Sequence, residues 1–205
     1  TVTWQKSVNS VRASVAEGQA LKQFRSGDLE GGIENLDKAI NLAPGVPNYY
    51  NNRAQVLFVY QTQPERFINR ECEQQTEFPY QVCLGVEALG FNLRSTDSQP
   101  FNYRASIAAG NTAFNLQLHE SAGESYASAA SMVPNAFEIR NDLAESKIDA
   151  GFYEEALAEL AWSLGITGDS SASTKALYLK GRALRELGLP DKAMGSLKQG
   201  LSLNY

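Results

Sequence analysis

The chain has 205 residues, of which 43% are hydrophobic and 20% are charged, and its formal net charge is −5. Such a composition is typical of a folded protein with enough apolar residues for a core along its whole length. A protein that holds a nucleic-acid backbone needs a basic surface, so the acidic balance argues against nucleic acid as a partner. The sequence has no apolar run of about 18 residues and no charged-then-apolar leader, so we expect neither membrane insertion nor a signal peptide.

The first predicted element is a helix at the start of the chain. Trp4, Val8, Val11 and Val15 recur at helical spacing. We expect residues 1–13 to extend the first repeat helix or to form a short capping helix, because a terminal repeat must cover an exposed apolar end. A docking element for a partner is the alternative.

A short phrase then recurs along the chain at a fixed period. It begins at Gly27 as Gly-Asp-Leu-Glu-Gly-Gly-Ile, at Gly151 as Gly-Phe-Tyr-Glu-Glu-Ala-Leu, and at Gly188 as Gly-Leu-Pro-Asp-Lys-Ala-Met. Each copy ends about one helix later in an apolar cluster. A period of this kind predicts stacked helical hairpins, with the glycine at the turn between two helices.

The spacing of small residues in the first helix of each hairpin sets the repeat register. The step is 34 residues from Ala20 to Ala54 and from Gly110 to Ala144, but 56 residues from Ala54 to Gly110. We therefore expect repeats that start near residues 13, 47, 103, 137 and 174, with an insertion of about 22 residues in the second repeat, at about 62–78.

These repeats resemble tetratricopeptide repeats, in which two antiparallel helices carry small residues and a turn glycine at fixed positions. The matching positions are Ala20, Gly27, Gly32, Ala39 and Pro44; Gly110, Gln117, Ala122, Ala129 and Pro134; Ala144, Gly151, Ala156, Ser163 and Gly168; and Gly181, Gly188, Ala193, Gly200 and Tyr205. Gln117 departs from the turn glycine. The resemblance implies an all-α, right-handed superhelical solenoid of about five hairpins, forming one domain over residues 1–205.

The resemblance also implies a binding surface, because the first helices of such repeats line a concave groove. In this register the inward-pointing candidates are Asn48, Asn51, Asn52, Gln55, Arg104, Asn111, Asn141, Tyr178 and Arg182. Asparagine both donates and accepts hydrogen bonds, so a series of them suits an extended peptide. The expected partner is a protein or peptide.

Cys72 and Cys83 are the only cysteines, and both lie at or beside the insertion. A disulfide between them would order a segment without a helical core and would place the protein outside the cytoplasm, in a periplasmic or cell-surface location. Two free thiols in a cytoplasmic protein are the alternative. Two cysteines and a distant His119 do not make the usual four-ligand zinc site, so we expect no metal.

The sequence holds no motif for catalysis: neither a His-Glu-x-x-His, nor a phosphate-binding glycine loop, nor a Gly-x-Ser-x-Gly elbow. We therefore expect a non-catalytic protein-binding scaffold without a cofactor. A looser resemblance, through the junction from Ala43 to Tyr50, is to the extracytoplasmic tails of bacterial O-antigen ligase-type membrane enzymes, which implies an accessory domain. A third alternative is a homodimer through the apolar face of the last helix, where Met194, Leu197 and Leu201 lie.

Overall fold

The computed structural model describes residues 2–62 and 80–203. The chain consists of two compact units, Thr1–Ala108 and Ala109–Tyr205, and the boundary between them falls inside one helix, α6 (Tyr103–Asn115). Unit 1 also contains α1 (Val2–Ser26), α2 (Leu29–Leu42), α3 (Pro47–Thr62) and α5 (Tyr80–Ser98). Unit 2 also contains α7 (His119–Met132), α8 (Phe137–Asp149), α9 (Tyr153–Thr167), η2 (Ser171–Ser173), α10 (Thr174–Glu186) and α11 (Pro190–Ser202).

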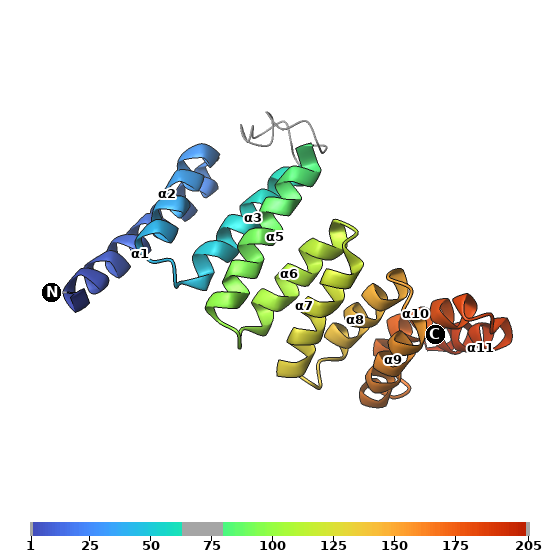
Figure 1. Cartoon of the computed structure of the whole chain (residues 1–205). Helices are drawn as coiled ribbons and strands as arrows, with labels where there is room; N and C mark the ends of the chain where they lie inside the picture. Colours follow the sequence, from blue (N-terminus) through green and yellow to red (C-terminus); the bar gives the residue numbers. More distant parts are fainter. Residues whose placement is uncertain (1, 63–79, 204–205) are drawn as a thin grey trace. The chain divides into compact units, whose positions relative to one another are not determined.

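Consecutive helices pair into antiparallel hairpins within each unit (Figure 1). In unit 1, α1 packs on α2 and α3 packs on α5; in unit 2, α8 packs on α9 and α10 packs on α11. All the regular structure in residues 2–62 and 80–203 is helical. The predicted all-α class, built from repeated helical hairpins, is confirmed.

Four of the turns between paired helices share one backbone conformation. Gly27, Gly151 and Gly188 have φ of 83°, 89° and 74°, and Gln117 takes the same left-handed conformation with φ of 61°. In each turn the N–H of the next residue donates to the carbonyl five residues back, as in the bond of 2.9 Å from Leu118 N to Ala113 O. This is the usual way in which a helix ends on a left-handed residue, and glycine enters that conformation without the steric cost of a Cβ.

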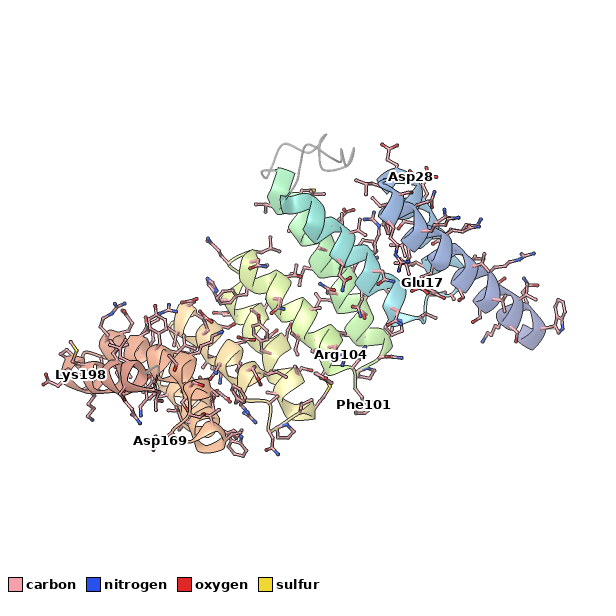
Figure 2. The ribbon with its side chains drawn as sticks, turned by 180° about the vertical axis from the view of Figure 1, so that it is seen from behind. Glu17, Asp28, Phe101, Arg104, Asp169 and Lys198 are labelled. Atoms are coloured by element: carbon pink, nitrogen blue, oxygen red, sulfur yellow. The ribbon has the colours of Figure 1, made fainter. Side chains whose placement is uncertain are left out.

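A side-chain cap reinforces the first turn. Asp28 precedes α2, and its Oδ1 accepts the N–H of Gly31 at 3.1 Å. The other oxygen, Oδ2, accepts Nε2 of Gln23 at 2.8 Å, which joins the end of α1 to the start of α2 (Figure 2). An N-cap of this kind stabilises a helix by about 1 kcal/mol.

Small residues at the repeat positions allow the paired helices to approach closely. A Cβ on Gly110 would lie 2.7 Å from the ring of Tyr126, and one on Gly181 would lie 2.8 Å from Leu197. Both distances are shorter than van der Waals contact, so any larger residue would push the two helices apart. This packing explains why the sequence repeats small residues at these positions.

Each unit has its own apolar core. In unit 1 the fully buried Leu57 and Leu84 join helices α3 and α5. In unit 2 the fully buried Leu160 and Leu179 join helices α9 and α10. Burial of one such side chain contributes roughly 1.5–3 kcal/mol, so these contacts between hairpins hold each unit together.

Unit 1 contains the predicted lead-in at its start and the predicted insertion within it. Helix α1 continues without interruption from Val2 to Ser26, so residues 2–13 form one helix with the first repeat. Trp4, Val11 and Val15 on this helix are exposed. The predicted insertion at about 62–78 lies, except for Thr62, outside the described residues.

Candidate functional site

The candidate site in unit 2 lies on the first helices of its hairpins, with one side chain contributed by α7. We call it the unit 2 face, and its residues are Asn111, Tyr126, Asp142, Glu145, Asp149, Lys175, Tyr178 and Arg182. Asp142, Glu145 and Asp149 are three and four residues apart on α8, so they lie on one side of that helix. Lys175, Tyr178 and Arg182 have the same spacing on α10 and lie on one side of it.

Ion pairs connect these two helices in a ladder. Nζ of Lys175 lies 2.8 Å from Oδ1 of Asp142 and 3.0 Å from Oε2 of Glu145. Seven residues further along α10, the guanidinium of Arg182 lies 2.6 Å from Asp149 and 3.7 Å from Glu145. The side chains are about a quarter to a half exposed, so solvent screens each pair and each contributes little stability. The main effect of the ladder is to hold the charged groups of α8 and α10 in fixed positions.

The environment of the ladder shifts two pKa values. Burial lowers the pKa of Lys175, but hydrogen bonds to Asp142 and Glu145 outweigh burial, so its pKa is raised. Burial raises the pKa of the Tyr126 hydroxyl well above its usual range, and the negative charges of Asp142 and Glu145 raise it further. The hydroxyl therefore stays protonated and donates to Oδ1 of Asn111 at 2.7 Å.

The predicted groove residues of unit 2 fall into two groups. Tyr178 is 54% exposed, and Asn111 is also exposed, so both are accessible from solvent. Arg182 is partly exposed and engaged in the ladder. Asn141, in contrast, is only 2% exposed, and its Oδ1 has no hydrogen-bond partner among the described residues. Asn141 is thus a core position of α8 and not an open groove position.

The predicted groove residues of unit 1 lie on α3 and at the start of α6. Nδ2 of Asn52 donates to Oε1 of Glu17 at 2.9 Å, which joins α3 to α1 (Figure 2). Asn51 is half-buried, whereas Asn48 and Gln55 are exposed. Asn52 and Glu17 thus link the first helices of neighbouring hairpins in unit 1, as the ion pairs do in unit 2.

Arg104 stands beside an exposed aromatic loop of unit 1. Its Nε donates to the Tyr103 hydroxyl at 3.4 Å, and this hydrogen bond raises the pKa of Arg104. The loop between α5 and α6 forms an open hollow of about 640 Å³, lined by Ser98, Gln99, Pro100, Phe101, Asn102, Tyr103 and Arg104. Phe101 is 90% exposed and points away from the helices (Figure 2).

The sequence prediction missed several residues of these faces, above all Lys175, Asp142 and Asp149. A signal for them exists: Asp142 and Lys175 are 33 residues apart, and so are Asp149 and Arg182. Opposite charges separated by almost one repeat are candidates for pairs between neighbouring first helices. Tyr126, on a second helix, has no such signal.

The remaining predicted features are the two cysteines and the expected lack of a metal site. Cys83 is disulfide-bonded, but Cys72 lies outside the described residues, so their pairing stays a prediction. Among the described residues, no group of three or more His, Cys, Asp or Glu side chains is placed to hold a metal ion. Within those residues, no helix combines the length and hydrophobicity that a membrane crossing requires.

Comparison with known proteins gives matches in sequence and in structure. Residues 141–201 match the tetratricopeptide repeat family. No curated protein matches the chain. Among solved structures, the chain is similar to MamA, with 15% identity over 93% of this chain and 91% of that chain and a TM-score of 0.70. A MamA from Desulfovibrio magneticus RS-1 is 10% identical, over 94% of this chain and 95% of the other, with a TM-score of 0.68.

A further solved structure is YrrB, described as a TPR protein with an unusual peptide-binding site. It is 16% identical over 92% of this chain and 84% of that chain, with a TM-score of 0.70. At such low identity these likenesses establish the fold. Residues 141–201 thus match tetratricopeptide repeats in sequence, and the helical hairpins of the chain share their fold with a solved tetratricopeptide-repeat structure.

Proposed function

We propose that this chain is a non-catalytic protein-interaction module that binds extended peptides on the first helices of its hairpins. The observation that carries the proposal is the position of Tyr178 on the unit 2 face. Its ring is 54% exposed and lies on the same side of α10 as Lys175 and Arg182, opposite the carboxylates of α8. An exposed aromatic ring among fixed charges is typical of a residue that anchors a partner.

The chemistry of the unit 2 face suits a peptide backbone. An extended peptide exposes both N–H donors and carbonyl acceptors, so its binding surface needs groups of both kinds. Lys175 and Arg182 supply donors, and the carboxylate oxygens of Asp142 and Asp149 supply acceptors. Because the ladder already holds these groups in place, a peptide would lose less free energy in ordering them.

The similar structures support an interaction role. YrrB is described as a TPR protein with a peptide-binding site, and its fold matches most of this chain. The fold alone does not identify a ligand, because function depends on the side chains at the site. The proposal for this chain therefore depends on the unit 2 face.

A library of unstructured peptides displayed on phage tests the proposal. We expect the full chain to select peptides whose affinity falls about tenfold or more with Tyr178→Ala, since aromatic anchors dominate such interfaces. Lys198→Ala is the control, because Lys198 is exposed on α11 and far along the chain from the α8–α10 ladder (Figure 2). Failure to enrich any peptide, or equal binding to Tyr178→Ala, would contradict the proposal.

We also propose that the protein works outside the cytoplasm, with Cys72 bonded to Cys83. The disulfide-bonded state of Cys83 supports this location, because such bonds persist in oxidising compartments. Thiol labelling of the denatured, unreduced protein followed by intact mass tests it. We expect no label before reduction and two labels after it; two labels before reduction would contradict both the bond and the location.

A second candidate function is self-association through α11. Met194 is 54% exposed and Leu201 is 64% exposed on this helix, which supports a contact between two copies. Sedimentation of the wild type and of Met194→Lys tests the idea. A dimer that Met194→Lys dissociates is expected, and a strict monomer at high concentration would eliminate it.

A further inference from the structure

The outer surface of α9 in unit 2 carries an apolar stripe that the peptide-binding face does not use. Among the described residues 156–166, every exposed residue is apolar or glycine. These residues are Ala158, Ala161, Trp162, Gly165 and Ile166. Their spacing of three and four places them on one side of the helix. We call this surface the α9 stripe.

Nothing in unit 2 covers the two large side chains of the stripe fully. Trp162 is 52% exposed and Ile166 is 40% exposed. The equivalent positions on α7 include Glu124, Ser128 and Ser131, and those on α11 include Lys198 and Gln199 in place of Ala161 and Trp162. A continuous apolar stripe is thus not a general property of the second helices in this unit. The α9 stripe is therefore a local feature of one repeat.

Gly165 has no role in the internal packing of unit 2. A Cβ built on this residue would meet no atom within 4 Å. Glycine weakens a helix compared with alanine, so its presence here is not explained by helix formation either. Together with Ala158 and Ala161, it leaves a shallow surface beside Trp162 on which another helix could lie closely.

The ring of Trp162 is held in place from one side. The guanidinium carbon of Arg140 lies 4.9 Å from the ring centroid, and Nη1 of Arg140 lies 2.6 Å from Oε2 of Glu159. A cation over the ring face and a carboxylate behind it fix the orientation of the indole. A partner would thus meet an aromatic group that is already ordered.

The charges around the stripe decide which partner fits. The nearby bases are neutralised, because Arg140 pairs with Glu159 and Lys147 pairs with both Glu155 and Glu159. The exposed charges beyond the ends that are not part of these ion pairs are acidic: Glu154 at the start of α9, and Asp169 after its end. A complementary partner is apolar opposite the stripe and basic beyond it.

The same charges argue against a second copy of this chain as the occupant. Two α9 helices packed antiparallel would bring Glu154 of one copy near Asp169 of the other. Two parallel helices would bring their Glu154 residues together. Both arrangements place like charges side by side, which opposes association.

We propose that the α9 stripe is a docking site for an amphipathic helix of another protein, with an apolar face and lysine or arginine about two turns from its apolar anchor. The distance from Glu154 to Trp162 along α9 is about 12 Å at 1.5 Å per residue, which sets the position of the basic residue. The site is separate from the unit 2 face, so it stands or falls independently of the proposed peptide binding.

A synthetic helical peptide tests the proposal on the full chain. The peptide has about 20 residues, long enough to form a helix, with leucine and alanine on one face and lysine near one end. Replacing Trp4 with Phe leaves Trp162 as the one tryptophan in the chain, so its fluorescence reports binding. We expect a blue shift of the emission on saturation, and about tenfold weaker binding for a peptide with glutamate in place of lysine.

The decisive variant is Gly165→Gln. Its side chain would project over the stripe, so we expect about tenfold weaker binding of the lysine peptide. Because a Cβ at this position meets open space and glutamine favours the helix more than glycine, folding is retained and Tm rises. Gly195→Gln on α11 is the matched control, since Gly195 is also exposed in a helix and also has open space around a Cβ.

Several outcomes would overturn the proposal. One is peptide binding that Gly165→Gln does not weaken, or that Gly195→Gln weakens equally. Another is the absence of any fluorescence shift with the lysine peptide. Binding to vesicles of anionic lipid that Gly165→Gln removes would assign the stripe to a membrane surface, and self-association that Gly165→Gln removes would assign it to a second copy. If Tyr178→Ala abolishes binding of the phage-selected peptides, that result concerns the unit 2 face and does not change the proposal for the α9 stripe.

Discussion

Gln117 offers a direct test of how the repeat turns control stability. It is the only non-glycine residue with positive φ in the described chain, and its turn makes the same hydrogen bonds as the glycine turns. A left-handed conformation costs an L-residue about 1–2 kcal/mol. Gln117→Gly removes that cost but adds about 0.4–1 kcal/mol of conformational entropy to the unfolded chain. The net expectation is a gain of about 0.5–1 kcal/mol.

The assay is urea unfolding of unit 2, followed by Trp162 fluorescence in a Trp4→Phe background. For a unit of about 100 residues the gain corresponds to roughly 3–6 °C in Tm, and the urea midpoint should rise with an unchanged m-value. Gly188→Gln is the reciprocal control: its φ of 74° predicts a loss of similar size. If Gln117→Gly does not raise the midpoint while Gly188→Gln does not lower it, left-handed strain does not control these turns.

Three further predictions concern unit 2. Gly110→Ala should destabilise it by about 1–3 kcal/mol, because the new Cβ meets the Tyr126 ring at 2.7 Å, whereas Gly123→Ala, with its nearest atom at 3.9 Å, should not; urea midpoints compare the two. Arg182→Gln should cost no more than about 1 kcal/mol and should reduce the fall of Tm with added salt, as melting at low and high NaCl will show. The pKa values of Lys175 and Tyr126 are raised in the folded chain, so above about pH 10 the folded chain keeps protons that the unfolded chain loses. Stability should therefore hold below about pH 10 and fall above it, and urea midpoints measured across that range test this expectation.

The hairpin architecture could be predicted from the sequence because it depends on local rules that repeat. A turn glycine such as Gly151 is favoured by the left-handed backbone of the turn, and a small residue such as Gly181 is favoured by the close contact between two helices. Both kinds of residue recur at the repeat step. Each copy therefore supports the others. Even Gln117, which breaks the pattern, takes the backbone conformation that the pattern predicts.

The site could be predicted only in part, because it depends on the rotation of each helix and on contacts between helices. Asn141 shows the first limit: it is 2% exposed, whereas the next residue on α8, Asp142, is partly exposed and belongs to the ion-pair ladder. Lys175 shows the second, since its importance follows from two carboxylates on a neighbouring helix. The apolar spacing of the chain contains no information about either contact.

The ion-pair ladder also has a mechanical consequence for unit 2. One contact between two rods acts as a pivot, but two separated contacts prevent the rods from turning. Lys175 and Arg182 tie α10 to α8 at two points seven residues apart, or about 10 Å along the helix. These two pairs therefore add to the resistance to twisting that the apolar packing between α8 and α10 already provides, and we expect their share to weaken as salt screens them. Ionic strength would thus act on the elasticity of this repeat pair before it acts on the folding of either helix.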